Sequence, residues 1–295
     1  MTKKSNMPCL LCHNENLKKV YEPPHAPGRF LYRCRGCGLL QMSPMPNAAD
    51  LADFYQRYDV LGEREPYYRE LWGANALQTP EGKDIRDRFI WAKSFCKVFG
   101  KTLDVGSGPG LFLKLVKADG GAAAGCELNA RAAARSAQEI GVPVFPGTIG
   151  EIPETGFDTI ALWDLLEHVN DPQKLIEDCR ARLKSGGWIF IETPDEAALL
   201  DRVVLLLAKL GIGGPAATFY GLHHLVLFRR ATVARLLEEN GFQVAAIAGA
   251  ATEPGRIFRG NGIKDRIVRL GLGGLFVVAK LIGKQNKMLV AARKK

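Results

Sequence analysis

An apolar strand that runs straight into a glycine-rich turn constrains the fold of this chain more than any other feature. Residues 103–110 read LDVGSGPG, and an amphipathic stretch follows at 111–118. This order predicts a strand, a tight turn and a helix, and the turn lets the backbone approach a nucleotide-like ligand because glycine carries no Cβ. Glu127 ends the next apolar run, about 20 residues past the glycines, where a carboxylate can accept both hydroxyls of a ribose.

Two other interpretations of the glycine turn are open. An ordinary strand-to-helix connection also uses glycine for a tight bend, but it does not need the acid at position 127. An NAD-binding turn has a third glycine three positions after the second, and Leu111 stands there instead. The spacing GxGxG, preceded by Asp104, therefore favours a different nucleoside-containing cofactor.

Four segments, in this order, resemble the class I S-adenosylmethionine-dependent methyltransferases over residues 83–293. They are LDVGSGPG at 103–110, CELN at 126–129, FDTIALWDLLEHVNDP at 157–172 and LKSGGWIFIETP at 183–194. The segment HHLVLFRRATVARLLEENGF at 223–242 is similar to the one that follows the fifth strand in small-molecule methyltransferases related to the ubiquinone-pathway enzymes. The resemblance implies a Rossmann-like α/β fold, with a doubly wound, seven-stranded mixed sheet that ends in an antiparallel edge hairpin. It also implies S-adenosylmethionine (SAM) as the cofactor.

By the same resemblance, residues at the ends of the predicted strands hold the cofactor. Asp104 would orient the glycine turn and the cofactor's amino group, and Trp163 and Asp164 would lie beside its methionine part. Thr148 departs from the pattern, because many relatives carry an acid there, near the adenine. The complete predicted set is Asp104, Gly106, Gly108, Gly110, Glu127, Leu128, Thr148, Trp163 and Asp164.

Strands and helices alternate beyond residue 100, which is typical of a parallel sheet covered by helices on both faces. Strands are predicted at 102–105, 122–127, 142–145, 158–163 and 187–193, with helices at 110–118, 129–140 and 172–184. A helix at 231–240 and strands at 242–249 and 288–292 complete the sheet. The predicted domains are a zinc ribbon (1–46), a helical lid or linker (47–100, with helices at 48–58 and 84–99) and a SAM-binding domain (101–295) with a substrate-side insert (195–225) and a basic insert (253–286).

Two C-x2-C pairs precede these elements, formed by Cys9 and Cys12 and by Cys34 and Cys37. Their spacing is close to that of four-thiolate zinc sites, and because four thiolates leave no position for water, the predicted Zn²⁺ is structural. Buried or disulfide-linked cysteines are the alternative. An odd total of seven cysteines and an N-terminus with no apolar run of signal-peptide length predict a reducing, cytoplasmic location.

Two histidines are the candidate catalytic residues. Methyl transfer from a sulfonium is an in-line displacement, in which an oxygen acceptor gains from a general base such as histidine. His168 follows the strand at 158–163, where open α/β sheets bind ligands, and His224 lies in the segment that resembles the substrate-side loop. The neighbouring His223 would point elsewhere in an extended segment. Packing or capping roles are the alternative for both candidates.

The predicted reaction is methyl transfer from SAM to an oxygen, with carbon as the second choice, of a small molecule that is lipid-like or sugar-derived. A zinc-ribbon RNA methyltransferase is one alternative, and a noncatalytic binding module with the same fold is another. Nucleic acid is not the expected partner, because the chain is nearly neutral before residue 256 and the ribbon has few aromatic residues for base stacking.

The last forty residues carry the excess charge of the chain. Residues 256–295 hold 11 basic residues and one acidic residue, against a net charge of +9 for the whole chain. Ile263, Ile267 and Leu270 follow helical spacing beside basic residues, and 272–282 is almost wholly apolar. The uncharged run is too short to span a bilayer. Residues 256–287 are therefore predicted to lie on an anionic membrane surface, on its inner face, with packing on the protein's own core or on a second subunit as the alternative.

Overall fold

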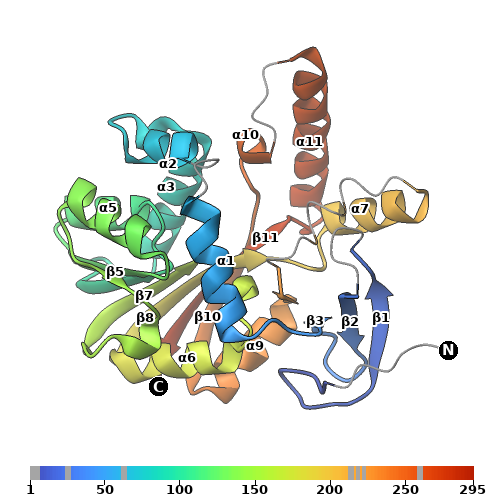
Figure 1. Ribbon diagram of the computed structural model, residues 1–295, viewed down its shortest axis with the longest axis horizontal. Helices are drawn as coiled ribbons and strands as arrows, with labels where there is room; N and C mark the ends of the chain where they lie inside the picture. The colour runs from blue at the N-terminus through green and yellow to red at the C-terminus, as the bar shows by residue number, and fades with distance from the viewer. Residues whose placement is uncertain are drawn as a thin grey trace.

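The computed structural model describes residues 7–23, 28–60, 65–211, Ala216, Tyr220, 224–257 and 262–295. Its centre is a seven-stranded sheet with the order β10-β11-β8-β7-β4-β5-β6 (Figure 1). The strands are β4 (Lys101–Val105), β5 (Ala122–Glu127), β6 (Val144–Pro146), β7 (Phe157–Trp163), β8 (Leu183–Pro194), β10 (Phe242–Ala250) and β11 (Lys287–Lys294). β11 pairs antiparallel with both β8 and β10, whereas the other neighbours are parallel. The predicted Rossmann-like mixed sheet with an antiparallel edge hairpin is confirmed.

Helices cover both faces of this sheet, because successive side chains of a strand point to opposite faces. Along β7, Ile160 and Leu162 enter one buried cluster, whereas Ala161 and Trp163 enter another. The first cluster includes side chains of α6 (Pro172–Arg182) and α9 (Arg230–Glu239), and the second those of α3 (Pro80–Lys93), α4 (Leu111–Ala118) and α5 (Ala130–Ile140). The sheet is therefore doubly wound.

Two helices precede α3, namely α1 (Ala48–Val60) and α2 (Glu65–Trp72), followed by the short 3-10 helix η1 (Ala76–Gln78). The helix predicted at 84–99 begins four residues earlier and ends six residues earlier than expected. Its start is fixed by Thr79, whose side chain accepts a hydrogen bond from the amide of Gly82, and by Pro80 in the first helical position. The sequence prediction missed this N-cap.

The cysteine-bearing segment forms a second sheet from β1 (Leu17–Tyr21), β2 (Phe30–Cys34) and β3 (Leu40–Ser43). A fourth strand, β9 (Val226–Leu227), pairs with β3 and comes from beyond β8, far along the chain. Leu40 of β3 and Phe228 belong to the same buried cluster as Leu162 of the large sheet. The segment predicted as a separate zinc ribbon thus shares both backbone pairing and core with the rest of the chain.

Helices from the two predicted inserts project beyond the sheets. α10 (Pro254–Ile257) and α11 (Ile263–Leu281) lie between β10 and β11, and Figure 1 shows α11 extending away from the large sheet. α7 (Leu199–Lys209) follows β8 and contacts α11. Within the described residues, no helix is both long and apolar enough to cross a membrane.

Candidate active site

A cavity of about 920 Å³ opens at the carboxyl ends of β4, β5 and β7. Pockets of about 300–1,000 Å³ are typical for small ligands, and this end of a parallel sheet is where open α/β folds bind them. Eight of the nine predicted cofactor residues line this cavity, and so do both predicted catalytic histidines: Asp104, Gly106, Gly108, Glu127, Leu128, Thr148, Trp163 and Asp164, with His168 and His224. Gly110 does not line the cavity. His223 lies outside the described residues.

The glycine turn after β4 has a left-handed backbone conformation, which residues with a Cβ rarely adopt. Gly106, Gly108 and Gly110 have φ angles of 71°, 50° and 74°, in the left-handed region. A Cβ on Gly110 would stand 2.0 Å from Cδ1 of Ile140, whereas one on Gly108 would meet no atom within 4 Å. Gly108 therefore presents bare backbone to the cavity, a place that a bound ligand can approach closely.

Glu127 connects the end of β5 to this turn. Its Oε2 accepts a hydrogen bond from the amide of Gly108 at 2.9 Å, and its Oε1 accepts one from the amide of Asn129 at 3.0 Å. The side chain of Asn129 donates to the carbonyl of Tyr55 at 3.1 Å, which ties α1 to the same edge of the cavity. Two backbone amides thus orient the Glu127 carboxylate at the cavity wall, where a carboxylate can accept ribose hydroxyls.

An acid that the sequence analysis missed lies next to Thr148. Oε2 of Glu151 accepts hydrogen bonds from the amide and from the hydroxyl of Thr148, both at 2.8 Å, and Glu151 also lines the cavity. The Thr148 amide and hydroxyl lower the pKa of the Glu151 carboxyl, so it is ionised at neutral pH. The T-x-x-E spacing of a capping box could have revealed this residue. It supplies an acid where Thr148 itself supplies none.

Two polar groups in the cavity wall suit a zwitterionic, cationic ligand. The carboxylate of Asp104 is buried, and burial raises its pKa, an effect that the charge of Arg88 partly offsets. Nε1 of Trp163 is buried and has no hydrogen-bond acceptor among the described residues. A ligand with an amino group for Asp104 and a carboxylate for Trp163 would satisfy both, and SAM carries this pair.

A buried ionic network surrounds Asp164, which follows β7 with a left-handed φ of 53°. Its carboxylate contacts Nζ of Lys287 at 2.6 and 2.7 Å, Arg88 at 3.0 Å and Arg256 at 3.3 Å. Burial alone would raise the pKa of Asp164, but these three cations outweigh it and hold the pKa well below its usual range. Arg88 and Lys287 also pair with Glu192. The prediction that Asp164 contacts the cofactor did not foresee these partners.

The two predicted catalytic histidines lie side by side in the cavity wall. The ring centroids of His168 and His224 are 5.1 Å apart, and the ligand atoms of both histidines and of Glu167 lie within 4.8 Å of one another. Glu167 is buried and accepts a hydrogen bond from the hydroxyl of Thr193 at 2.9 Å. Burial and the charge of Asp164 raise the pKa of Glu167 to about 8, so this carboxyl holds a proton at neutral pH. The two histidines predicted as catalytic thus lie beside a protonated carboxyl in the cavity wall.

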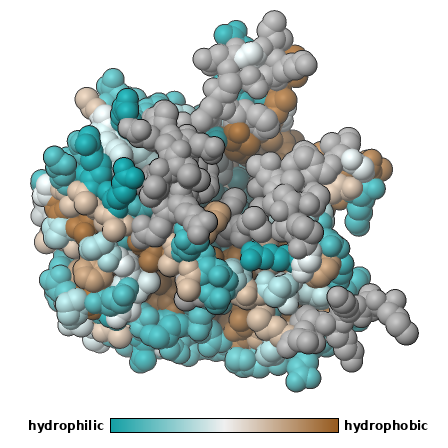
Figure 2. Space-filling model, viewed as in Figure 1, coloured by the Kyte–Doolittle hydropathy of each residue, from teal (hydrophilic) through white to brown (hydrophobic). Residues whose placement is uncertain are grey.

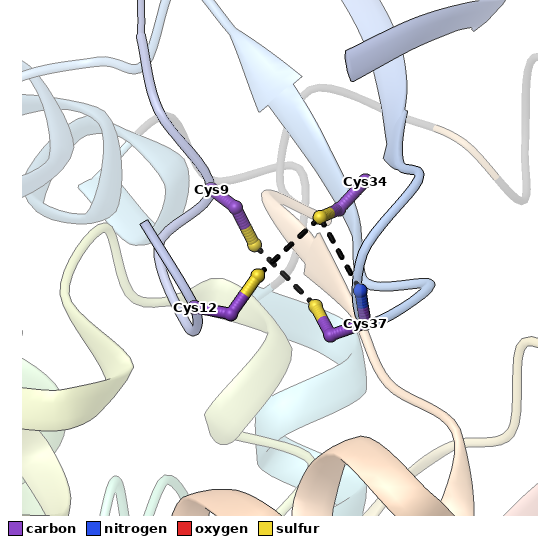
Figure 3. A group of neighbouring side chains, drawn as sticks. All are labelled: Cys9, Cys12, Cys34 and Cys37. Atoms are coloured by element: carbon purple, nitrogen blue, oxygen red, sulfur yellow. Dashed lines mark hydrogen bonds between the residues drawn. The ribbon is translucent and has the colours of Figure 1, made fainter. Parts of the chain in front are cut away.

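The four cysteines of the N-terminal segment converge on one point (Figure 3). Sγ of Cys9 lies 3.5 Å from that of Cys37, Sγ of Cys12 lies 3.5 Å from that of Cys34, and all four sulfurs lie within 4.8 Å of one another. A disulfide needs about 2.05 Å. A tetrahedral Zn²⁺ with bonds of about 2.3 Å sets sulfur atoms about 3.8 Å apart. The cluster therefore fits a four-thiolate zinc site.

Comparisons with known proteins agree with this geometry. A family model described as a methyltransferase domain matches residues 79–247, which include the whole cavity edge from Asp104 to His224. The ubiquinone biosynthesis O-methyltransferase of Burkholderia pseudomallei (strain K96243) is 30% identical over 200 residues, which cover 62% of this chain and 82% of that protein. The protein of the same name from Paracidovorax citrulli is 27% identical over 175 residues, covering 56% and 69%. Other relatives of that name are matched over 56% of their length.

Two solved structures share the fold. Magnesium protoporphyrin IX methyltransferase from Synechocystis PCC 6803, with bound SAH, superposes with a TM-score of 0.57 at 12% identity and covers 84% of this chain and 100% of that one. The 1,6-didemethyltoxoflavin-N1-methyltransferase of Burkholderia thailandensis gives a TM-score of 0.55 at 14% identity, covering 94% and 99%. At such identities the likeness concerns the fold alone.

Proposed function

The chain belongs to the class I SAM-dependent methyltransferases, and from this premise we propose that it methylates a hydroxyl oxygen of a small molecule. The pair of histidines in the wall of the cavity that the glycine turn also lines is the observation that carries the proposal. Oxygen as the acceptor atom is supported by the curated relatives, which are named O-methyltransferases. An imidazole base suits an acidic hydroxyl, so a phenol is the favoured acceptor class.

In this proposal, different predicted residues bind different parts of the cofactor. The Gly106–Gly110 turn lets the backbone approach the nucleoside, Glu127 accepts the ribose hydroxyls, and Leu128 with Thr148 and Glu151 borders the adenine. Asp104 and Trp163 hold the amino and carboxylate groups of the methionine part, beside Asp164. SAM supplies a methyl group on a sulfonium, and the protein's task is to hold the acceptor in line with it and to exclude water.

The chain's own chemistry is then proton removal from the acceptor. His224 or His168 takes the hydroxyl proton through an imidazole nitrogen as the new O–C bond forms, and releases it to solvent afterwards. Glu167, which keeps its own proton at neutral pH, adds no negative charge beside the attacking oxygen. Two imidazoles and a neutral carboxyl thus surround the site of attack.

Replacing His224 or His168 by glutamine is expected to lower kcat by about a hundredfold or more, because each removes a candidate base. The affinity for SAM should stay unchanged, because the cofactor groups lie on other residues. Turnover is measured with methyl-labelled SAM and a panel of alkylated phenols, and affinity by calorimetry. His13→Gln, in the cysteine segment, is the control. Unchanged turnover in both variants would mean that a carboxylate, or no residue, acts as the base.

We propose further that Cys9, Cys12, Cys34 and Cys37 bind a structural Zn²⁺. The sulfur spacing supports this, and so does the knuckle geometry, because Sγ of Cys34 accepts hydrogen bonds from the amides of Gly36 and Cys37 at 3.3 and 3.5 Å. Such amides stabilise a thiolate. The ion would hold the turns of a small segment together and take no part in the chemistry.

We also propose that α11 rests on an anionic membrane surface, which would give the enzyme access to a lipid-like acceptor. Leu270 and Leu281 are 78% and 81% exposed, Ile267 is 63% exposed, and Arg266 and Lys280 are exposed beside them. Figure 2 shows exposed apolar residues where Figure 1 places α11 and α7. Apolar side chains flanked by cations are the composition of interfacial helices.

The protein is expected to co-sediment with phosphatidylglycerol vesicles at low salt. Leu270→Glu with Leu281→Glu should weaken that binding at least about tenfold, because two apolar contacts are lost. Ile90→Glu with Val98→Glu is the matched control, since these residues of similar exposure (66% and 67%) lie away from α11 and the charge change is the same. Absence of binding by the wild type, or equal loss in both double variants, would refute the proposal.

A further inference from the structure

The segment that carries His224 is held by the cysteine-bearing sheet. β9 begins two residues after His224 and pairs with β3, with Gln41 opposite Val226. The amide of Met42 donates to the carbonyl of Leu225 at 2.8 Å, and the amide of Leu225 donates to the carbonyl of Glu167 at 2.8 Å. The residue next to His224 is therefore clamped between the N-terminal sheet and the turn that bears His168.

One side chain connects this clamp to the cysteine cluster. Gln41 is fully buried, and both ends of its amide are used: Oε1 accepts from the amide of Leu10 at 2.9 Å, and Nε2 donates to the carbonyl of Pro8 at 3.1 Å. Pro8 and Leu10 are the two neighbours of Cys9. A buried amide of this kind fixes the distance between the groups that it joins, because leaving either group unpaired is costly.

A second connection lies at the other end of β9. Glu196 pairs with Arg33 of β2 and with Arg229, and its amide donates to the carbonyl of Phe228 at 2.9 Å. Arg33 also reaches the carbonyl of Gly38, next to Cys37, at 3.4 Å. Both cysteine pairs are thus linked, through Gln41 or Arg33, to the short strand that follows His224.

We infer that the four-cysteine segment is a working part of the active site and that Gln41 is the positioning residue that couples it to His224. The inference rests on the proposed role of His224. Gln41 does not itself line the cavity, and it acts through the β3–β9 pairing. The cofactor side, built from β4 and β5, receives no strand from this sheet.

The test uses full-length protein labelled with ¹³C at Cε1 of its five histidines, each signal being assigned by one substitution. Gln41→Met keeps the side-chain volume and removes both hydrogen bonds. We expect the His224 signal to shift or broaden, one zinc per chain to remain, and SAM affinity measured by calorimetry to be unchanged. Gln173→Met is the matched control, because Nε2 of Gln173 also donates to the carbonyl of Leu10, at 3.1 Å, but from α6. It should leave the His224 signal in place.

A His224 signal that is unmoved in Gln41→Met, or moved equally by Gln173→Met, would overturn the inference. If Gln41→Met fails to fold, the wild type provides the second measurement, in which 1,10-phenanthroline withdraws the metal. The His224 signal should then shift while SAM still binds, and an unmoved signal after complete metal loss would also overturn the inference. Full turnover of His224→Gln would refute the base role of His224, whereas the effect of Gln41→Met on the His224 signal is measured in a protein that keeps His224, so the two failures are distinguishable.

Discussion

Replacing Glu127 by alanine is expected to weaken SAM binding by about a hundred- to ten-thousandfold. Two charge-assisted hydrogen bonds to ribose hydroxyls would be lost, at roughly 1.5–3 kcal/mol each. The glycine turn would also lose a partner, because Oε2 of Glu127 accepts from the amide of Gly108. Calorimetric titration with SAM and with its demethylated product measures the loss, and NADH in the same experiment should bind neither variant nor wild type.

The control for this prediction is Glu139→Ala. Glu139 is an acid on α5 that pairs with Arg135 at the surface, at 2.6 Å, and lies outside the cavity wall. Its removal should leave SAM affinity unchanged. Affinity of Glu127→Ala within threefold of the wild type would contradict the assignment of Glu127 to the ribose, and NADH binding would mean that the cavity selects a different nucleoside.

Replacing Arg88 by methionine is expected to lower the free energy of unfolding by about 3–5 kcal/mol, the usual cost of removing one partner from a buried ion pair. The side chain of Arg88 is 8% exposed and contacts both Asp164 and Glu192. Without it, two buried carboxylates share the remaining cations, Lys287 and Arg256. Urea denaturation of the variant measures the change.

The pH dependence of this effect separates it from a packing defect. The pKa of Asp164 is held well below its usual range, so its contribution to stability is present above the unfolded pKa of about 4 and is lost as pH falls through the folded value. The difference between wild type and Arg88→Met should thus narrow in acid. Arg135→Met, which breaks the surface pair with Glu139, should cost under about 1 kcal/mol. A difference that does not narrow in acid would point to lost packing instead.

The parts of the fold that could be predicted from sequence are those with a local signal. Glycines before an amphipathic stretch predicted the β4–α4 turn, and the acid at 127 predicted the residue at which β5 ends. Paired cysteines gave the N-terminal cluster in the same way. In each case residues a few positions apart in the chain carry the whole pattern.

The parts that escaped prediction depend on residues far apart. One example is the ionic network of Arg88, Asp164, Arg256 and Lys287, which forms because four elements converge at one end of the sheet. No residue spacing in the sequence predicts these contacts. β9 is two residues long, too short for a strand period to show. Only the folded structure shows that β9 pairs with β3. The same pairing connects the cysteine-bearing sheet to the rest of the chain.

That pairing also sets an order of events during synthesis. The cysteine segment leaves the ribosome before β9, because the strand that completes its sheet is encoded after β8, and the ion-pair partner of Arg33 lies 163 residues further on. Contacts between residues so far apart in the sequence form slowly, because a large loop must close before the contacts contribute any stabilising free energy. Until then β3 presents an unpaired edge that a neighbouring chain could join. The cysteine-bearing sheet therefore stays incomplete until the chain beyond β8 has been made.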